Sequence, residues 1–169
     1  FSGLTSARAV DMLATAQARG LPVTADVAAY QLLLCDEDLN GFSSLLHVMP
    51  PLRSAADRRA LREAVQSGVV QAIASHHRPH EPEVKRVPFA ASAPGISSVE
   101  ILLPLALTLV ADGLLELPAL LSRLTTGPAA ALNLQAGQLT LGGAADLTLF
   151  DPAKACEIGR NWLSRGANC

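Results

Sequence analysis

The sequence has few aromatic residues, few cysteines and no marked excess of charge. Aromatic residues make up 4% of the 169 residues, whereas 50% are hydrophobic, so the core must be built from aliphatic side chains. The length allows one domain with a substantial core. The three cysteines, Cys35, Cys156 and Cys169, are odd in number and form no Cys-x-x-Cys pair. This pattern argues against a disulfide framework or a cysteine zinc site and favours a reducing, cytoplasmic location.

The charge pattern and the hydrophobic runs exclude two further classes of partner. The formal net charge is -2, and basic residues occur only in scattered pairs such as Arg58-Arg59 and Lys85-Arg86. We therefore expect neither a nucleic acid nor a membrane surface as partner. The longest apolar run, 101–111, is interrupted by Pro104 and is shorter than the roughly 20 residues that span a bilayer. Because the chain begins at Phe1 rather than at a methionine, we expect it to be a piece of a longer protein.

Helical and strand-like segments alternate along the first two thirds of the chain. Helices are predicted over 5–20, capped by Thr5 or Ser6, and from Ser54 to Gly68, with a Ser-x-x-Asp capping box. Each helix is followed by a short apolar strand, at 21–29 and 69–74. Such alternation predicts an α/β fold with a parallel sheet, as an open sheet or as part of a barrel.

The rest of the chain is predicted to hold a long loop, further helices and a strand pair. The loop runs from Ser75 to Gly95, and a helix capped by Ser97 or Ser98 should follow, kinked at Pro104 and ended by Gly113. Two more short helices are expected at Pro118 and Pro128, and two strands at 139–141 and 147–150.

The loop segment "IASHHRPH", residues 73–80, is the clearest candidate for chemistry. It contains His76, His77 and His80, and neutral imidazole is a common zinc ligand. However, Pro79 prevents a regular helix through the segment, and no glutamate stands beside the histidines as a base. From residue types alone, a solvated or hydrogen-bonded loop is favoured over a metal site.

Two other segments could bind an anion. Arg53 follows Pro50-Pro51, which stiffen the backbone and could aim the guanidinium at a carboxylate. The "ASAPGI" loop, 91–96, leads into a helix start with free backbone N–H groups. A rigid turn and an ordinary helix start are the favoured interpretations of these segments. The acidic run 36–38 is interpreted as a solvated loop.

Read together, several motifs resemble the C-terminal half of a dihydroorotase, a cyclic amidohydrolase of pyrimidine biosynthesis. The family's Asp-His-x-Pro-His, Pro-Phe, Pro-Gly-Ile, Asn-Pro-Pro-Leu-Arg and Gly-x-Ala-Asp-Leu motifs all have counterparts here. The matching segments are His76–His80, Pro88-Phe89, Pro94–Ile96, Met49–Arg53 and Gly143–Leu147. The resemblance covers nearly the whole chain. It implies part of an amidohydrolase-type (β/α) barrel over 1–133, and strands of a small β-sandwich domain with a C-terminal tail over 134–169.

The departures from the family's motifs bear on catalysis. The resemblance assigns metal binding and proton transfer to the motif's aspartate, and here His76 occupies that position. A metal-binding histidine of the family aligns with Gly3, its Thr-Pro-His-His segment with Ala28–Gln31, and its substrate-contacting asparagine with Met49. The family's His-x-His and its bridging carboxylate or carbamylated lysine have no counterpart, and too few strands are present to close a barrel.

These departures lead us to expect a non-catalytic dihydroorotase homologue. No catalytic residue is then expected. Arg53, His80, Pro94 and Gly95 would remain from a substrate pocket. No metal or other cofactor is expected, with His76 and His77 as weak metal candidates.

The resemblance also implies a structural role in assembly with aspartate transcarbamoylase, whose catalytic chain would be the partner. The incomplete sheet could equally be covered by a second copy or by a missing N-terminal half of the same chain. Two alternatives stay open. One is an active zinc-dependent hydrolase of cyclic amides that uses His76, His77 and His80. The other is a sensor module that binds dihydroorotate through Arg53 and loop N–H groups.

Overall fold

A computed structural model describes residues 1–154 of the chain. Within this range the structure is α/β, as predicted, and the long loop between Ser75 and Gly95 contains only short 3-10 turns. The α-helices are α1 (Ala7–Ala18), α2 (Ala55–Ser67), α3 (Leu102–Ala111), α4 (Leu117–Leu124) and α5 (Thr126–Ala131). The strands are β1 (Asp26–Ala28) and β2 (Ala72–Ala74). The 3-10 helices are η1 (Ala29–Leu32), η2 (Asp36–Leu39), η3 (Ser44–Leu46), η4 (Pro82–Lys85) and η5 (Phe89–Ala91).

The two strands lie side by side and run parallel, with Asp26 opposite Ala72 and Ala28 opposite Ala74. The first residues of the chain lie along the other side of β1. Asp26 N–H donates to the Phe1 carbonyl oxygen at 3.1 Å, and Leu4 N–H donates to the Asp26 carbonyl oxygen at 3.0 Å. Three extended segments therefore meet at Asp26, and the predicted parallel arrangement is confirmed.

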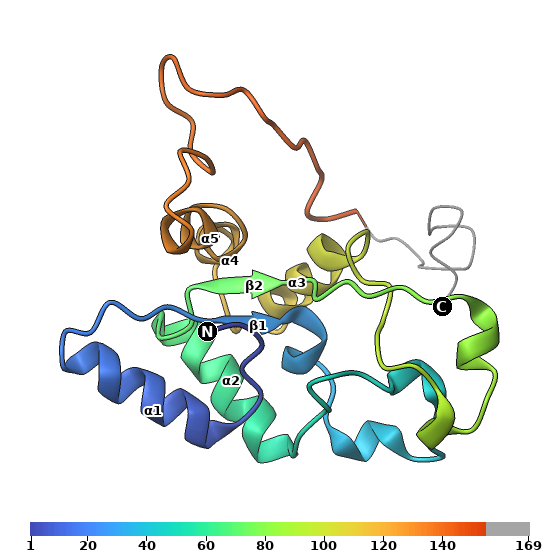
Figure 1. Cartoon of the computed structure of the whole chain (residues 1–169). Helices are drawn as coiled ribbons and strands as arrows, with labels where there is room; N and C mark the ends of the chain where they lie inside the picture. Colours follow the sequence, from blue (N-terminus) through green and yellow to red (C-terminus); the bar gives the residue numbers. More distant parts are fainter. Residues whose placement is uncertain (155–169) are drawn as a thin grey trace.

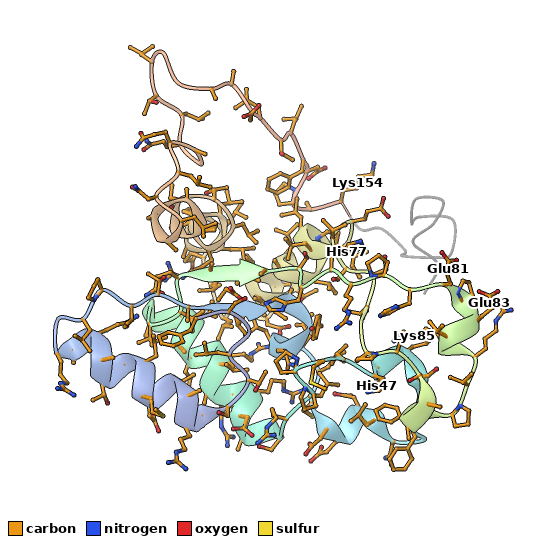
Figure 2. All side chains as sticks on the ribbon, in the orientation of Figure 1. His47, His77, Glu81, Glu83, Lys85 and Lys154 are labelled. Atoms are coloured by element: carbon orange, nitrogen blue, oxygen red, sulfur yellow. The ribbon has the colours of Figure 1, made fainter. Side chains whose placement is uncertain are left out.

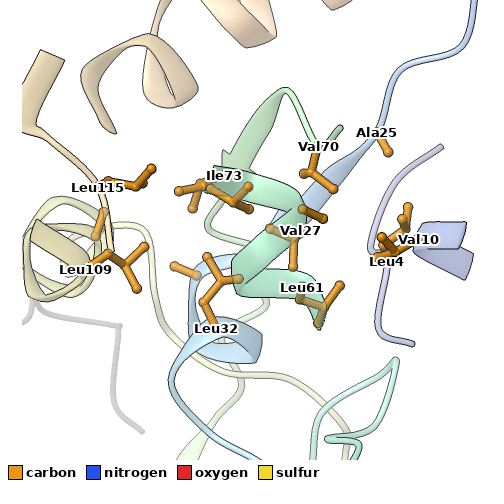
Figure 3. Close-up of a cluster of buried hydrophobic side chains, with 14 of the residues drawn as sticks. Leu4, Val10, Ala25, Val27, Leu32, Leu61, Val70, Ile73, Leu109 and Leu115 are labelled. Carbon is orange, nitrogen blue, oxygen red and sulfur yellow. The ribbon is translucent and has the colours of Figure 1, made fainter. Parts of the chain in front are cut away.

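Aliphatic side chains of the strands and helices form the main core. Figure 1 shows α1 and α2 on one side of the strands and α4 and α5 on the other. Val27, Val70 and Leu120 are fully buried, and Leu61 and Leu109 are nearly so. Figure 3 shows Val27, Ile73 and Leu61 among the clustered side chains of this core. Because aromatic residues are scarce, packing depends on the many methyl groups of Leu, Val and Ala.

The starts of the first two helices follow the predicted capping. Ser6 caps α1, and its Oγ accepts the Ala9 N–H at 3.3 Å. Ser54 caps α2, where its Oγ accepts the Asp57 N–H at 3.2 Å and donates to Asp57 Oδ2 at 2.7 Å. Gly68, with φ of 88°, ends α2 in the left-handed conformation that glycine adopts without strain.

Two predictions on local structure are wrong. The helix expected from Ser97 or Ser98 begins at Leu102. Ser98 does not cap it, because its hydroxyl donates to the Ser75 carbonyl oxygen and its N–H donates to His77 Nδ1. Pro104 therefore falls in the first turn of α3, where its missing N–H breaks no helical hydrogen bond, so the reason for the predicted kink is absent. The strands predicted at 139–141 and 147–150 are absent from the described sheet, which contains only β1 and β2.

Four leucines of the predicted strands lie in solvent rather than against a neighbouring strand. Leu139, Leu141, Leu147 and Leu149 are 85%, 108%, 69% and 101% exposed. A strand needs a hydrogen-bonded neighbour, and no described segment lies beside them.

The proposed domain division at residues 133 and 134 stays a prediction. Residues 155–169, with Cys156 and Cys169, lie outside the described part. Along residues 1–154, no helix is long and apolar enough to cross a bilayer.

Candidate functional site

His76, at the position where the resemblance places a catalytic aspartate, is hydrogen-bonded to the carboxylate of Asp26. Its Nε2 lies 2.8 Å from Asp26 Oδ1, and the same oxygen accepts the Gly3 N–H at 2.9 Å. The His76 and Asp26 side chains are only 20% and 22% exposed. Because Asp26 accepts, Nε2 of His76 carries the proton in this contact. The imidazole is thus positioned by a carboxylate of β1.

The environment of Asp26 favours its ionised form. Burial alone would raise the pKa of this carboxyl group. The hydrogen bonds from His76, Gly3 and Ser2 outweigh that effect, and the pKa of Asp26 lies below the ordinary value. An ionised Asp26 therefore lies beside His76 where the two parallel strands meet the loops. The sequence does contain a signal for this pair, because Asp26 is an acidic residue inside an otherwise apolar predicted strand. Asp26 was not identified as a site residue in the sequence analysis.

The space beside Gly3 is already filled. A Cβ at this position would lie 3.0 Å from His76 Cε1 and 3.7 Å from Pro50, and the φ of Gly3 is +74°. Such a φ strains residues that carry a side chain. A histidine at position 3 could be accommodated only if His76 moved.

The positions aligned with the two histidines of the family's Thr-Pro-His-His segment are Tyr30 and Gln31, and both side chains pack inside the protein. Tyr30 and Gln31 are 4% and 2% exposed, and burial raises the pKa of the Tyr30 hydroxyl. The Gln31 side-chain amide donates to the carbonyl oxygens of Pro50 and Pro51 at 3.1 and 3.3 Å. Gln31 thereby holds the Pro-Pro loop against the strand ends. Met49, just before this loop, is 61% exposed.

His77 has a fixed tautomer. Its Nδ1 accepts the backbone N–H groups of Ser98 and Val99 at 3.0 and 3.2 Å, so this nitrogen carries no proton and a neutral ring has its proton on Nε2. A metal would need an unprotonated nitrogen with a free lone pair. His77, labelled in Figure 2, therefore orders the turn before α3, and the residue is exposed.

Three of the four predicted pocket residues lie together. His80 Nε2 donates to the Pro94 carbonyl oxygen at 3.0 Å, and a Cβ on Gly95 would lie 2.9 Å from the same Nε2. Arg53, the fourth, is exposed immediately before α2. It lies near Asp57, whose pKa is lowered first by the Ser54 hydroxyl, then by the Ala7 N–H, and also by the Arg53 charge.

Lys85 ties the loops of this region together and was missed by the sequence analysis. It is 5% exposed, and its ammonium group donates to the carbonyl oxygens of Gly95, Ser44 and His47 at 2.7, 3.1 and 3.4 Å. The Ser44 hydroxyl in turn donates to the Lys85 carbonyl oxygen. Figure 2 shows Lys85 close to His47, whereas Glu81 and Glu83 lie at the outer edge. The adjacent pair Lys85-Arg86 gave no signal that one member is buried.

The side chain of His47 adds an aromatic contact to this loop region. Its ring stacks on Phe89 with centroids 4.5 Å apart, and its Nδ1 lies 2.8 Å from Ser92 Oγ. Because the Ser92 hydroxyl donates to the Phe89 carbonyl oxygen at 2.7 Å, Nδ1 of His47 is the donor in its contact with Ser92. Figure 2 labels His47 among these loops.

The described residues do not fit a zinc ion. Zinc in proteins takes a tetrahedral set of nitrogen, sulfur or oxygen ligands with free lone pairs. Residues 1–154 contain no group of three or more His, Cys, Asp or Glu side chains placed to hold a metal. His76 pairs with Asp26, His77 uses Nδ1 for backbone groups, and His80 Nε2 donates to Pro94. Of these three rings, His77 alone has the lone pair of its unprotonated nitrogen engaged, so what speaks against zinc is the lack of a third nearby ligand among the described residues.

A parallel sheet covered by helices, with a histidine-rich loop after a strand, is the arrangement of an amidohydrolase barrel segment. The model of the amidohydrolase family matches residues 1–165. The chain therefore belongs to the amidohydrolase family. The L-hydantoinase (dihydropyrimidinase) of Arthrobacter aurescens superimposes with a TM-score of 0.79 at 26% identity, over 85% of this chain and 33% of that one. The predicted barrel-type fold is confirmed.

Within this family the similar sequences are dihydroorotases and their relatives. The "dihydroorotase-like protein" of Pseudomonas aeruginosa is 66% identical over 99% of this chain and 40% of its own length. The dihydroorotase of Syntrophus aciditrophicus is 41% identical over 98% of this chain and 39% of its own length. The chain thus spans about 40% of the length of these relatives. The resemblance to dihydroorotases is confirmed.

A further structural likeness concerns the fold alone. The inactive dihydroorotase-like domain of a multifunctional CAD-like protein from Chaetomium thermophilum aligns with a TM-score of 0.60 and 24% identity. It covers 79% of this chain and 36% of that one.

Proposed function

We propose that the chain is part of a non-catalytic dihydroorotase homologue. The contact between His76 Nε2 and Asp26 Oδ1, at 2.8 Å, carries this proposal. A hydrolase of this class needs a group that accepts a proton from water and passes it to the leaving nitrogen. At the position where the resemblance places that group, His76 donates its Nε2 proton to Asp26, and the neighbouring Gly3 supplies no ligand.

Two further observations support the proposal. His77 uses the lone pair of its Nδ1 for the Ser98 and Val99 N–H groups, which removes this imidazole from metal binding. A relative that is 66% identical is named dihydroorotase-like rather than dihydroorotase.

The proposed role is architectural, in assembly with the catalytic chain of aspartate transcarbamoylase. The exposed apolar side chains of the described residues support a role in association. Met12 on α1 is 66% exposed, Phe42 is 73% exposed and Leu149 is 101% exposed. Large apolar side chains in contact with water favour burial against another surface, whether of the same polypeptide or of a partner.

The test combines catalysis with assembly on the intact protein. We expect no dihydroorotate hydrolysis and no stoichiometric zinc by elemental analysis after zinc loading, together with co-elution with aspartate transcarbamoylase in size-exclusion chromatography. Stoichiometric zinc with turnover would refute the non-catalytic role, and separate elution would refute the architectural one.

Single substitutions can then locate the contact. Met12→Glu, Phe42→Glu and Leu149→Glu each place a charge on a different exposed apolar side chain, and at least one should release the partner. Arg59→Glu on the exposed surface of α2 is the control for a charge change alone. Unchanged co-elution of all the variants would argue against an apolar contact at these positions.

A further inference from the structure

Three segments that are distant in sequence are joined at one carboxylate oxygen. Asp26 Oδ1 lies on β1, accepts the Gly3 N–H from the segment before α1, and accepts from His76 Nε2 in the loop after β2. The distances are 2.9 and 2.8 Å. Charge-assisted hydrogen bonds of this length are stronger than neutral ones.

We infer that the Asp26–His76 pair is an internal link that takes the place of a metal ion here, and that restoring an aspartate at position 76 does not restore zinc binding. This inference rests on the proposed function, in which no metal acts at this position. After His76→Asp, the nearby groups would be two carboxylates, Asp26 and the new aspartate. Gly3 has no side chain, and His77 Nδ1 already accepts two backbone N–H groups.

A new aspartate at position 76 would face the carboxyl group of Asp26 without the imidazole that helps to lower the pKa of Asp26. Two carboxyl groups would then lie close together, and ionising both would be unfavourable. The protein would therefore lose an attractive pair and gain a repulsive one. A histidine at position 3 would not complete the site, because the φ of +74° strains any side chain there.

The backbone at position 76 allows a clean comparison of charge. The φ of His76 is 47°, in the left-handed region, where asparagine and aspartate are among the residues best tolerated. His76→Asp and His76→Asn therefore add little backbone strain, have nearly the same size and differ in charge. Arg78→Asn, at an exposed position of the same loop, is the control for a change of loop sequence.

The experiment measures melting temperature and bound zinc for the intact protein and these variants, without aspartate transcarbamoylase. We expect both His76 variants to melt below the wild type, by several degrees, and Arg78→Asn to melt with it. His76→Asp should melt below His76→Asn at neutral pH. The gap should close near about pH 3, where carboxylates become protonated. Zinc chloride should leave the order of the variants unchanged, and elemental analysis should find no stoichiometric zinc in His76→Asp.

Two results would overturn the inference. One is uptake of one zinc ion per chain by His76→Asp with a rise in its melting temperature that His76→Asn lacks. The other is a His76→Asn protein as stable as the wild type. If His76→Asp does not fold, His76→Gln tests the link between Asp26 and position 76. The longer glutamine side chain can still donate an amide N–H to Asp26, so His76→Gln should melt above His76→Asn. If the wild-type protein failed to co-elute with the transcarbamoylase while these results held, only the proposed architectural role would be refuted.

Discussion

Gly95 and His80 are in contact so close that a single added carbon would not fit. A Cβ on Gly95 would lie 2.9 Å from His80 Nε2 and 2.4 Å from the Arg78 carbonyl oxygen, and the φ of Gly95 is +154°. The His80 ring, which donates to the Pro94 carbonyl oxygen, therefore closes the loop over this glycine. The residues His80, Pro94 and Gly95, which the resemblance assigns to a substrate pocket, therefore pack against one another.

Gly95→Ala should accordingly destabilise the protein by about 1–3 kcal/mol or more, the range for overpacked sites, since the clashing atom is backbone. Chemical denaturation measures the change. Gly20→Ala is the control, because Gly20 also has a positive φ, +76°, but nothing within 4 Å of its Cβ position. Equal losses for the two variants would show that φ alone, not the contact, determines the cost.

The stability of the protein should fall in acid partly through Asp26. Because the pKa of Asp26 is lowered in the folded state, its contribution is fully present above the ordinary carboxyl pKa of about 3.9 and is lost as pH falls through the lower folded value. Asp26→Asn should remove this part of the acid dependence. Urea unfolding between about pH 5 and pH 2 would measure it. An unchanged slope in the variant would contradict the assignment.

Lys85→Met should destabilise the protein by about 1–3 kcal/mol, since the carbonyl oxygens of Gly95, Ser44 and His47 would lose a buried charged donor. Lys154→Met, at an exposed lysine, is the matched control and should change the unfolding free energy little. Similar unfolding midpoints for both variants would argue against a structural role of Lys85.

Leu61→Ala should cost about 2–5 kcal/mol, because Leu61 is 1% exposed in the aliphatic core and truncation leaves a cavity. Leu21→Ala is the control, since Leu21 is 49% exposed. The two unfolding free energies, measured under the same conditions, give the comparison. A loss at position 61 no larger than at position 21 would contradict the placement of the core.

The segment 138–150 forms no strand in the described structure, and we expect it to pair only where a longer protein supplies a neighbouring strand. Leu139 and Leu141, and likewise Leu147 and Leu149, alternate in the manner of a half-buried strand, yet all four are exposed among the described residues. Amide hydrogen exchange of the full-length protein should reveal protected N–H groups in this segment. Exchange as fast as in an unstructured peptide would remove the basis for a terminal β domain.

The sequence alone predicted the elements whose signals are local. Ser6 and Ser54 marked helix starts, Gly68 marked a helix end, and runs of aliphatic residues marked the buried parallel strands. Capping, left-handed turns and hydrophobic periodicity depend on neighbours in the chain. The order of several short motifs was enough to indicate the family.

The tertiary structure decided what the polar residues do. The sequence places Asp26 and His76 fifty positions apart, and only the parallel pairing of β1 with β2 brings them to 2.8 Å. The sequence around Lys85 likewise does not indicate that this residue is buried. In the structure its ammonium group donates to three carbonyl groups from two loops. Burying a charge costs solvation free energy, and only hydrogen-bonding or charged partners offset that cost. Since these partners come from distant segments of the chain, the tertiary structure determines where a charge can be buried.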